Sequence, residues 1–477
     1  MKKVLLTVSA VLVVIFAISP AMSAYHHEGE SDSPNFLALY PSTAGTKLDH
    51  CATCHTGGEY EKKPGKWISL GSCQWCHYSY GYDGSGNIVD TLNPYGKDYW
   101  LNGRNQAALE TIESKDSDED GYTNRVEIDA VRYPGNADDD PSKVPAPSRV
   151  YTRAQLEALT RHTQFMLMNT SRSGDFYVQY TGVPVEDLLE DAGILATATG
   201  ITVFAPDGWS NYHPLEIDSD PELYHVKGVY PEAVYYYDTQ ADTALNPVSG
   251  WCDYSAPSCA GRSNKDLIVN PGGLKMILAY EREGQDLEPG VLGGDSKLTG
   301  EGPYRLVPPQ KAPCPPDQAS SAEDQDVTWP YDFNWDHNGG AASRTATIIR
   351  IEPLPEGTTD IDLLEAGWQY VDEEKILIYG ALTALASYVA ADGNCSDHSP
   401  CYSSIQTAIN EASGTAVLKV REGSYSEDVT LNTNRQIALE SGLDTGFTSV
   451  SGESRIRSAT VAMGTLILKK GKLVVGE

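Results

Sequence analysis

Two copies of one short pattern lie near the N-terminus: Cys51-Ala52-Thr53-Cys54-His55 and Cys73-Gln74-Trp75-Cys76-His77. Each reads Cys-x-x-Cys-His, the attachment pattern of a c-type haem. In such a site the two thiols bond to the porphyrin, and the histidine that follows binds its iron. The sequence therefore predicts two covalent haems. The predicted attachment residues are Cys51, Cys54, Cys73 and Cys76, and the predicted iron ligands are His55 and His77.

The same four cysteines also fit a structural zinc ribbon, because the two pairs are 18 residues apart. A four-cysteine zinc site would not use the histidine that follows each pair. The tyrosines and tryptophans around the pairs suit the cover of a large flat macrocycle. Haem is therefore preferred to zinc and to two plain disulfides.

The first 24 residues have the three parts of a secretory signal peptide. Lys2 and Lys3 precede an apolar run from Val4 to Ile18, and small residues follow at Ala21, Ser23 and Ala24. The run is shorter than the ~20 apolar residues that span a bilayer, and no later stretch is apolar enough. We expect export to the periplasm or to the outside of the cell, with no transmembrane segment after the signal is removed and surface attachment only by other means.

The formal net charge is -31 and the sequence pI is about 4.6. Such a surface repels nucleic acid, so no nucleic-acid partner is expected. Cysteines outside the two haem patterns form two closely spaced pairs and one single residue. In an oxidising compartment Cys252 with Cys259, and Cys395 with Cys401, are spaced to close small disulfide loops. Cys314 has no obvious partner and is a free thiol, a ligand or a cross-link.

Residues 116–127 read Asp-Ser-Asp-Glu-Asp-Gly-Tyr-Thr-Asn-Arg-Val-Glu. This matches the twelve-residue calcium loop of an EF-hand, in which the sixth residue is a glycine that permits the turn. The alternative is a solvated acidic loop. The expected calcium ligands are the side chains of Asp116, Asp118, Asp120 and Glu127 and the backbone carbonyl of Tyr122. An apparent linker, Val144-Pro145-Ala146-Pro147, follows.

The rest of the chain shows short periodic segments. Helices are expected at Asn105–Ser114, after Arg153 with an apolar side at Leu156, Leu159, Phe165, Met166 and Met168, at Val185–Ala192 and at Ser403–Ala412. Strands are expected at Ile201–Ala205, Lys275–Tyr280, Tyr304–Val307, Ala346–Ile351, Lys375–Tyr379, Ala416–Val420, Asp428–Leu431, Gln436–Leu439, Thr460–Ala462, Leu466–Leu468 and Lys472–Val475.

The middle of the chain resembles the molybdopterin-binding domain of the sulfite oxidase family. The segments that carry the resemblance are Tyr180–Val185, Asp187–Leu189, Ala192–Gly193, Val203–Trp209, Leu278–Glu281 with Gly284, Gly302–Pro308 and Ile348–Glu352. That family holds molybdenum through a cysteine upstream of the Gly-Val-Pro segment, whereas no cysteine lies between Cys76 and Cys252 here. A soft thiolate is the ligand that this site requires, so the resemblance implies the fold without the molybdopterin.

Two haem patterns, the calcium-like loop and Gly300-Glu301-Gly302-Pro303 together resemble the dihaem GEGP-motif proteins of iron- and sulfur-reducing deltaproteobacteria. This resemblance covers residues 25 to about 382 and implies an exported electron-transfer protein. The tail resembles the first coils of a right-handed parallel β-helix, with Gly423-Ser424-Tyr425 as its turn, and a β-sandwich is the alternative.

We therefore expect a multidomain, mainly β protein with a small α/coil haem module, an α+β middle domain and a β-helix-like tail. The expected parts are a signal peptide (1–24), a dihaem module (25–112), a calcium-loop segment with linker (113–148), a sulfite-oxidase-like domain (149–382) and a β-helix-like module (383–477).

The preferred function is electron transfer with other redox proteins or extracellular acceptors. The alternatives are an oxidoreductase whose middle domain passes electrons to the haems, and a non-catalytic surface-binding protein. The candidates for the distal iron positions are His26, His27, His50, His162, His213, His225, His337, His398, Met166 and Met168. A methionine ligand would raise the reduction potential relative to a histidine.

Overall fold

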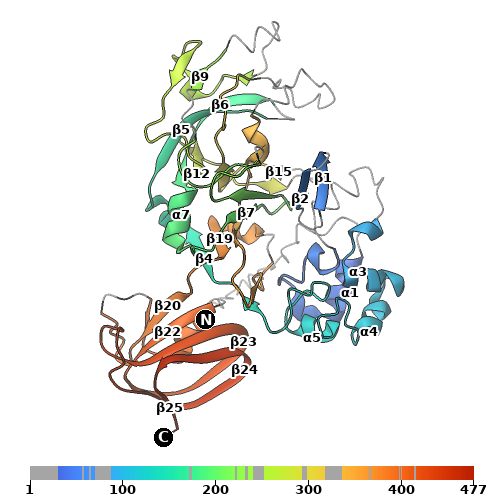
Figure 1. Cartoon of the computed structure of the whole chain (residues 1–477), viewed down its shortest axis with the longest axis vertical. Helices are drawn as coiled ribbons and strands as arrows, with labels where there is room; N and C mark the ends of the chain where they lie inside the picture. The colour runs from blue at the N-terminus through green and yellow to red at the C-terminus, as the bar shows by residue number, and fades with distance from the viewer. Residues whose placement is uncertain are drawn as a thin grey trace, which may run out of the picture.

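The computed structural model describes residues 31–55, 59–63, 66–69, 88–170, 174–220, 223–230, 235–239, 252–292, 298–316, 336–364, 367–396, 398, 400–412 and 415–476. The predicted signal peptide, His26, His27 and the second Cys-x-x-Cys-His pattern with Cys73, Cys76 and His77 lie outside these residues. The described chain is mainly β and divides into three units (Figure 1). We call them the N-terminal unit (31–147), the middle unit (148–382) and the C-terminal unit (383–476).

In the part of the chain that the structure describes, the N-terminal unit is built from four short helices around a small core. They are α1 (Asp32–Leu39), α3 (Pro94–Leu101), α4 (Gln106–Ile112) and α5 (Asn124–Asp129), with a hairpin of β1 (Glu59–Lys63) and β2 (Lys66–Ser69). The core is made of Phe36, Tyr40, Leu48, Tyr95, Tyr99, Ala108, Leu109, Ile112, Ile128 and Tyr133. The expected helix near 105–114 is confirmed as α4. The helices α1 and α3 were not predicted from the sequence.

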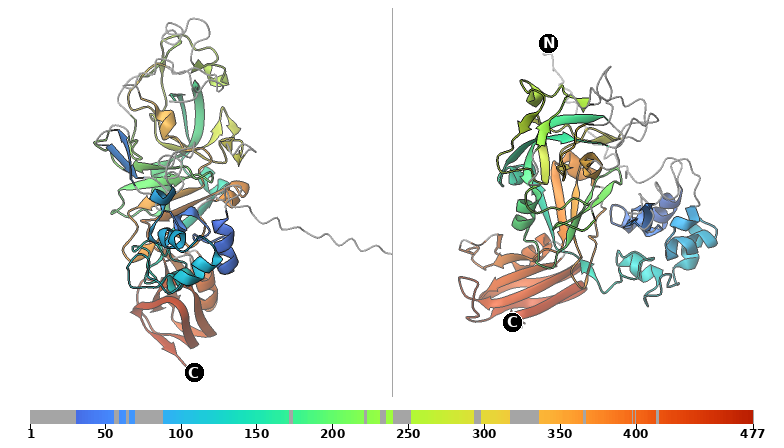
Figure 2. Two further views of the ribbon diagram at one scale, coloured as in Figure 1. Left: turned by 90° about the vertical axis from the view of Figure 1, so that its right-hand side faces the viewer. Right: turned by 45° about the horizontal axis from the view of Figure 1, so that its top comes forward.

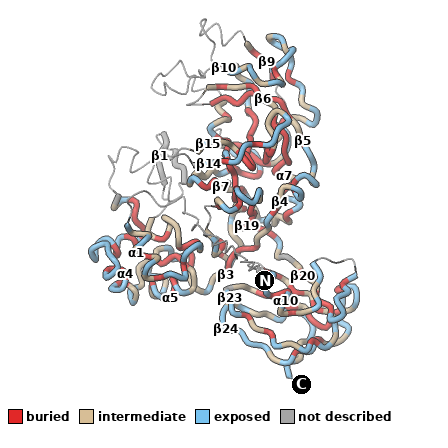
Figure 3. The backbone as a smooth tube through the Cα atoms, turned by 180° about the vertical axis from the view of Figure 1, so that it is seen from behind, coloured by how far each residue is buried: buried red, intermediate tan, exposed pale blue. Residues whose placement is uncertain are grey.

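The middle unit contains two larger sheets. The first runs β10 (Cys252–Asp253), β6 (Asp175–Pro184), β12 (Ile277–Arg282) and β13 (Gln285–Asp286), with β5 (His162–Met168) on β6 and β16 (Arg305–Val307) on β12. The second runs β4 (Ser148–Thr152), β19 (Lys375–Gly380), β17 (Ile348–Glu352), β7 (Gly200–Phe204) and β8 (Ser210–Pro214). Figure 3 shows long buried stretches on β5, β6 and β7. The two sheets share the largest of the described apolar clusters, so this unit is held mainly by hydrophobic burial.

Smaller elements complete the middle unit, and one strand pair joins it to the N-terminal unit. They are β3 (Val144–Pro145) with β18 (Thr358–Thr359), β9 (Tyr235–Tyr237) with β11 (Asp266–Ile268), β14 (Val291–Leu292) with β15 (Leu298–Thr299), and the helices α6 (Arg153–Glu157), α7 (Val185–Ala192) and α9 (Trp368–Asp372). The expected helix at 185–192 and the five expected strands between 201 and 379 are confirmed. The helix α9 was not expected.

The helix expected after Arg153 is wrong beyond its first turns. α6 ends at Glu157, and the following apolar residues form β5, which pairs antiparallel with β6 from His162 opposite Gly182 to Met168 opposite Phe176. β5 is buried at nearly every position. A strand covered on both faces is a continuous apolar run, and such a run cannot be told from a buried helix by its periodicity.

Two further expectations are corrected. The segment 144–147 is not a free linker, because all four residues are buried and β3 pairs in parallel with β18 of the middle unit. Cys252 and Cys259 do not form a disulfide, and both thiols are buried in the core of the middle unit. Cys395 and Cys401 do form one, as expected.

The C-terminal unit is a six-stranded sheet in which every pairing is parallel. Its order is β21 (Cys401–Tyr402), β20 (Leu385–Val389), β22 (Thr415–Arg421), β23 (Gly423–Leu443), β24 (Ser454–Gly471) and β25 (Leu473–Val475). The helix α10 (Ile405–Glu411) covers it with Ile405, Ala408 and Ile409 buried, as expected. Five of the expected strands between 416 and 475 fall within β22, β23 and β24, and the sixth, Lys472–Val475, appears as β25 without its first residue.

The units keep distinct places in the molecule. β9 and the C-terminal unit lie at opposite ends, and the N-terminal unit lies to one side (Figures 1 and 2). No helix among the described residues has both the length and the apolar character to cross a membrane.

Candidate functional site

The first Cys-x-x-Cys-His pattern forms a tight turn in the N-terminal unit. Cys51–Thr53 is one turn of 3-10 helix, and the amides of Cys54 and His55 donate to the carbonyl of Cys51 at 3.1 and 2.9 Å. Cys51 and Cys54 are half-buried thiols outside any disulfide. Two thiols presented from one turn at partial exposure are accessible to a ligand, as covalent attachment requires.

The ring of His55 is oriented by a neighbour from a distant part of the chain. Its Nδ1 lies 2.7 Å from Oγ1 of Thr91, and its backbone pairs with that of Leu92. Histidines that bind metals commonly hold their second ring nitrogen in such a contact, which fixes the tautomer. In this arrangement Nε2 is the atom of His55 that would bind iron.

The N-terminal end of α3 is hydrogen-bonded to the turn. The Asn93 side chain donates to the carbonyls of Ala52 and Thr53, each at 3.1 Å, and its backbone amide donates to Cys54 O at 3.0 Å. Its side-chain oxygen accepts from the amide of Gly96 at 2.8 Å and so caps α3. A Cβ at Gly96 would lie 2.1 Å from the carbonyl oxygen of Cys54, so the helix approaches this closely only with glycine there.

Tyr95 shows a further feature that fits a bound cofactor. Its side chain is fully buried, and its hydroxyl has no hydrogen-bond partner among the described residues. Burial, with the Cys54 thiol nearby, raises the pKa of Tyr95 well above its usual value. Leaving a buried polar group unpaired costs about 1–3 kcal/mol. A polar substituent of a group attached at Cys51 and Cys54 would supply the missing partner.

Among the candidates for a distal iron ligand that the structure describes, His50 lies in the N-terminal unit. Its Nδ1 accepts the amide N–H of Ala52 at 3.0 Å and caps the turn. Burial lowers the pKa of His50 to about 4, against the opposing effect of Asp360 and Asp49. The imidazole is therefore neutral near pH 7 and is engaged in capping the turn at Cys51–Thr53.

The other described candidates for distal positions lie in the middle and C-terminal units. His162 lies on β5, and its Nε2 is 3.0 Å from the carbonyl oxygen of Gly273. Met166 and Met168 lie on the same strand and are buried. Nδ1 of His213 and Nδ1 of His225 lie 3.2 and 2.7 Å from the carbonyls of Tyr224 and Lys227. His337 precedes a short 3-10 helix, and the ring of His398 stacks on Tyr388. The structure brings none of these to the turn at Cys51.

The predicted calcium loop gathers its acidic side chains at one point. Ligand atoms from Asp116, Asp118 and Asp120 all lie within 4.8 Å of one another. Glu127 is fully buried, and neither of its carboxylate oxygens has a hydrogen-bond partner among the described residues. The same holds for both oxygens of Asp118. Oxygens that converge without donors are the ligand set of a hard cation such as Ca²⁺.

The backbone of the loop also follows the EF-hand arrangement. Gly121 has φ +100°, and its amide donates to Oδ2 of Asp116 at 2.9 Å. Asn124 closes the loop, because its side-chain nitrogen donates to the carbonyl of Ile112 at 2.8 Å and to Oγ of Ser117 at 2.9 Å. α4 and α5 flank the loop as the two helices of such a motif do.

Without a cation, the negative charges of the loop carboxylates repel one another. Burial, followed by Asp118, Asp120 and Asp116, raises the pKa of Glu127 to about 9. Burial and then Asp120 raise the pKa of Asp118 to about 6. A divalent cation would remove both causes, since it compensates the burial of the carboxylates and their mutual repulsion.

The Gly-Glu-Gly-Pro segment has a packing role in the middle unit. Glu301 accepts from Arg282 at 3.1 Å, from the hydroxyl of Tyr180 at 3.1 Å, and from Arg305. Burial by itself would raise the pKa of Glu301, but Arg305 and Arg282 outweigh it and lower that pKa. A Cβ at Gly300 or at Gly302 would lie 2.5 Å from a backbone carbonyl oxygen, so both positions require glycine.

Cys314 lies at the wall of a cavity of about 170 Å³ in the middle unit. The cavity is lined mainly by aromatic and apolar side chains, including Phe165, Tyr177 and Tyr235. Sγ of Cys314 accepts from the side-chain amide of Gln310 at 2.8 Å. The thiol is half-buried and outside any disulfide.

Sequence reasoning missed the residues that hold the turn, namely Thr91, Asn93, Tyr95 and Gly96. The pair Asn93-Pro94 is a helix-start signal, with a capping side chain followed by proline at the first helical position. That signal predicts α3 but not what α3 packs against. No protein-family model, no curated protein and no solved structure matches the chain.

Proposed function

We propose that the protein is an exported dihaem c-type cytochrome that transfers electrons and that carries a structural calcium ion. The observation that carries the proposal is the turn at Cys51–His55. It presents two thiols from one helical turn, orients His55 through Nδ1, and has an unpartnered buried hydroxyl beside it. A zinc ribbon gives no role to the last two features.

The chain's own residues would hold the first haem through Cys51, Cys54 and His55, with Asn93 and Gly96 fixing the turn. Bound haem iron supplies one-electron redox chemistry. Cys73, Cys76 and His77 would hold the second haem in the same way. We further propose that the middle unit has the sulfite-oxidase-like fold, that the C-terminal unit is β-helix-like, and that the partners are redox proteins or extracellular acceptors.

The test is a count of covalent haem on the purified protein. We expect the denatured chain to keep its colour and to carry the mass of two tetrapyrroles. The double variant Cys51→Ser with Cys54→Ser should lose one of them. The matched control, Cys252→Ser with Cys259→Ser, changes two buried cysteines of the middle unit and should keep both. A colourless denatured chain, or one that contains zinc, would refute the proposal.

Calcium is proposed from the buried, unpartnered oxygens of Glu127 and Asp118. We expect one tightly bound calcium ion per chain by elemental analysis and calorimetry, with binding weakened by Glu127→Gln. Calcium stoichiometry unchanged by that substitution would place the ion elsewhere.

The alternative oxidoreductase has one favourable observation, the aromatic cavity with Cys314 at its wall. Molybdenum counted on the same sample distinguishes the two proposals. One molybdenum per chain, lost in Cys314→Ser, would favour the enzyme, and its absence would favour an electron carrier.

A further inference from the structure

The calcium loop and the haem-attachment turn lie in the same small unit, and the contacts between them can be followed residue by residue. The path begins at Glu127, the last expected calcium ligand. Its backbone carbonyl accepts the amide of Arg132 at 2.8 Å, directly after α5. Any displacement of Glu127 therefore moves the segment that begins at Arg132.

The next contact is made by Gly135. A Cβ built on Gly135 would lie 2.6 Å from Cγ and from Oδ1 of Asn93. The backbone of Gly135 does not have a positive φ, so glycine is needed here for space and not for conformation. The side chain of Asn93 donates hydrogen bonds to carbonyls of the turn at Cys51. The segment after the calcium loop therefore packs, through Gly135, directly against the side chain that holds this turn.

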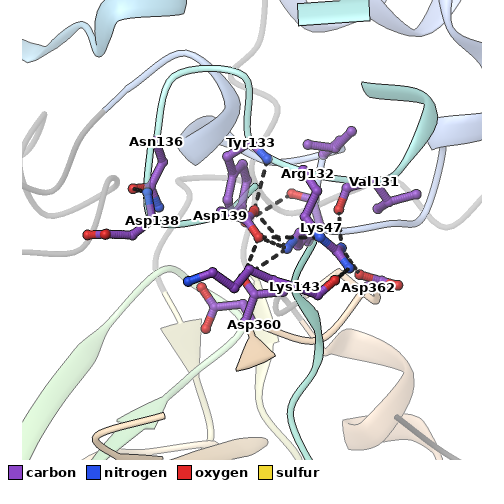
Figure 4. Close-up of polar contacts among 12 residues, drawn as sticks. Lys47, Val131, Arg132, Tyr133, Asn136, Asp138, Asp139, Lys143, Asp360 and Asp362 are labelled. Atoms are coloured by element: carbon purple, nitrogen blue, oxygen red, sulfur yellow. Dashed lines mark hydrogen bonds and ion pairs between the residues drawn. The ribbon is translucent and has the colours of Figure 1, made fainter. Parts of the chain in front are cut away.

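A second contact runs through Asp139 (Figure 4). Its carboxylate is fully buried, accepts the amide of Tyr133 at 2.9 Å and pairs with Nζ of Lys47 at 2.8 Å. Lys47 lies four residues before Cys51 and is itself buried. The hydroxyl of Thr359 in β18 also donates to Asp139. One carboxylate thus joins the calcium segment, the approach to the turn and the middle unit.

Arg132 completes this buried network. Its guanidinium lies 3.7 Å from Asp139, donates to Oδ1 of Asp362 at 2.8 Å and donates to the carbonyl of Lys143 at 2.6 Å. Breaking one partner out of a buried ion pair is costly, at about 3–5 kcal/mol, because a charge is left buried and uncompensated. A shift of the segment 132–139 that separated these charges would therefore be costly, so we expect Lys47 and Asp362 to move with it.

We infer that calcium in the loop 116–127 fixes the position of the haem-attachment turn and its junction with the middle unit, through Gly135 on Asn93 and Asp139 on Lys47. Without the ion, nothing compensates the burial of Glu127 or the mutual repulsion of the three converging aspartates, and we expect α5, which carries Glu127, to move away from the loop. The inference rests on the proposed calcium and haem sites. Asn93, Gly135 and Asp139 act as positioning residues.

The experiment measures amide hydrogen exchange by mass spectrometry on the full-length, haem-loaded protein, with calcium and with a calcium chelator. We expect chelation to speed exchange by about ten-fold or more in peptides covering 46–55 and 88–96, as well as in 113–129, and to leave β7 unchanged. A redox titration should show the midpoint of one haem shifting and the other staying. Faster exchange confined to 113–129, with both midpoints unchanged, would overturn the inference.

Gly135→Ala tests the path apart from the ion. It should keep calcium affinity within about three-fold by calorimetry, yet show fast exchange at the turn even with calcium bound. The matched control is Gly446→Ala, at a glycine whose added Cβ meets no atom closer than 3.7 Å, and it should behave as wild type. A Gly135→Ala protein whose turn exchanges like wild type refutes the path. If that variant does not fold, chelation of the wild type decides.

The outcomes separate this inference from the proposed function. A chain that carries no covalent haem refutes electron transfer, while exchange at the turn with and without calcium still reports the coupling. A chain that binds no calcium in calorimetry refutes the coupling, while covalent haem still supports the cytochrome.

Discussion

The N-terminal and middle units reach a stable fold by different means. The middle unit buries a large apolar cluster shared by its two sheets, whereas the N-terminal unit has a small cluster around four short helices. Among the described residues, most buried side-chain oxygens without hydrogen-bond partners lie in the N-terminal unit, at Tyr95 and in the calcium loop. Small domains bury too little apolar surface to be stable alone and depend on ligands or cross-links. The comparison agrees with the proposal that bound groups complete the N-terminal unit, whereas side-chain packing completes the middle unit.

The largest effect should come from removing Glu127, the proposed calcium ligand at the twelfth position of the loop. Glu127→Gln should lower the stability of the N-terminal unit by about 4 kcal/mol at calcium a thousand-fold above the dissociation constant, because the binding free energy is lost from the folded state. Urea unfolding followed by hydrogen exchange of α3 and β12 peptides measures the two units separately. The matched control is Glu110→Gln on the exposed face of α4. Equal losses in both units would contradict the comparison.

A core truncation should produce the opposite pattern. Leu278 is fully buried on β12, and Leu278→Ala should cost the middle unit about 3–4 kcal/mol through lost burial and a cavity. Leu267→Ala, at a half-exposed leucine of the same unit, should cost under about 1 kcal/mol. The denaturant midpoint of the middle unit is the measurement, and calcium affinity should stay the same in both variants. A change in calcium affinity would show that the units are not independent in this direction.

Acid should weaken the middle unit through one buried histidine. Burial lowers the pKa of His213 from 6.5 to about 4, and its Nε2 has no hydrogen-bond partner among the described residues. As pH falls from 6.5 towards 4, the unfolded chain takes up a proton that the folded chain refuses, so stability is lost. The loss should approach about 3 kcal/mol. His213→Asn can still donate to the carbonyl of Tyr224. Between pH 7 and pH 4 its unfolding free energy, measured with urea, should fall by about 3 kcal/mol less than that of the wild type. Identical pH slopes in the two proteins would exclude His213 as the cause.

The smallest effect concerns the C-terminal unit, which has its own core and a disulfide. Cys395 and Cys401 close a loop with a sequence separation of 6. In the loop-entropy description such a short loop stabilises by about 2 kcal/mol. Cys395→Ser with Cys401→Ser should lower the thermal midpoint of this unit alone, and wild type with reductant should match it. A loss that spreads to the middle unit would show that the two units unfold together.

Local signals in the sequence were enough for many elements. The helices expected at 105–114, 185–192 and 403–412 appear as α4, α7 and α10. The acidic loop could be recognised from the spacing of its residues, because its expected ligands come from one continuous stretch. The apolar run at 162–168 was misread, since only its pairing with β6 makes it a strand.

The sequence by itself determined which chemical groups are present and in what local order: the Cys-x-x-Cys-His patterns and the acidic loop. Only the tertiary structure decided what surrounds them. Thr91 beside His55, Gly96 and Asn93 on the turn, and Asp139 between Lys47 and Thr359 all join residues distant in the chain. Such contacts depend on packing and charge compensation across the whole fold, and no local pattern records them. The physical reason is that a buried carboxylate needs a partner that compensates its charge, and a glycine without a positive φ is needed where another part of the chain approaches closely. Both conditions depend on neighbours in space, which the order of residues does not reveal.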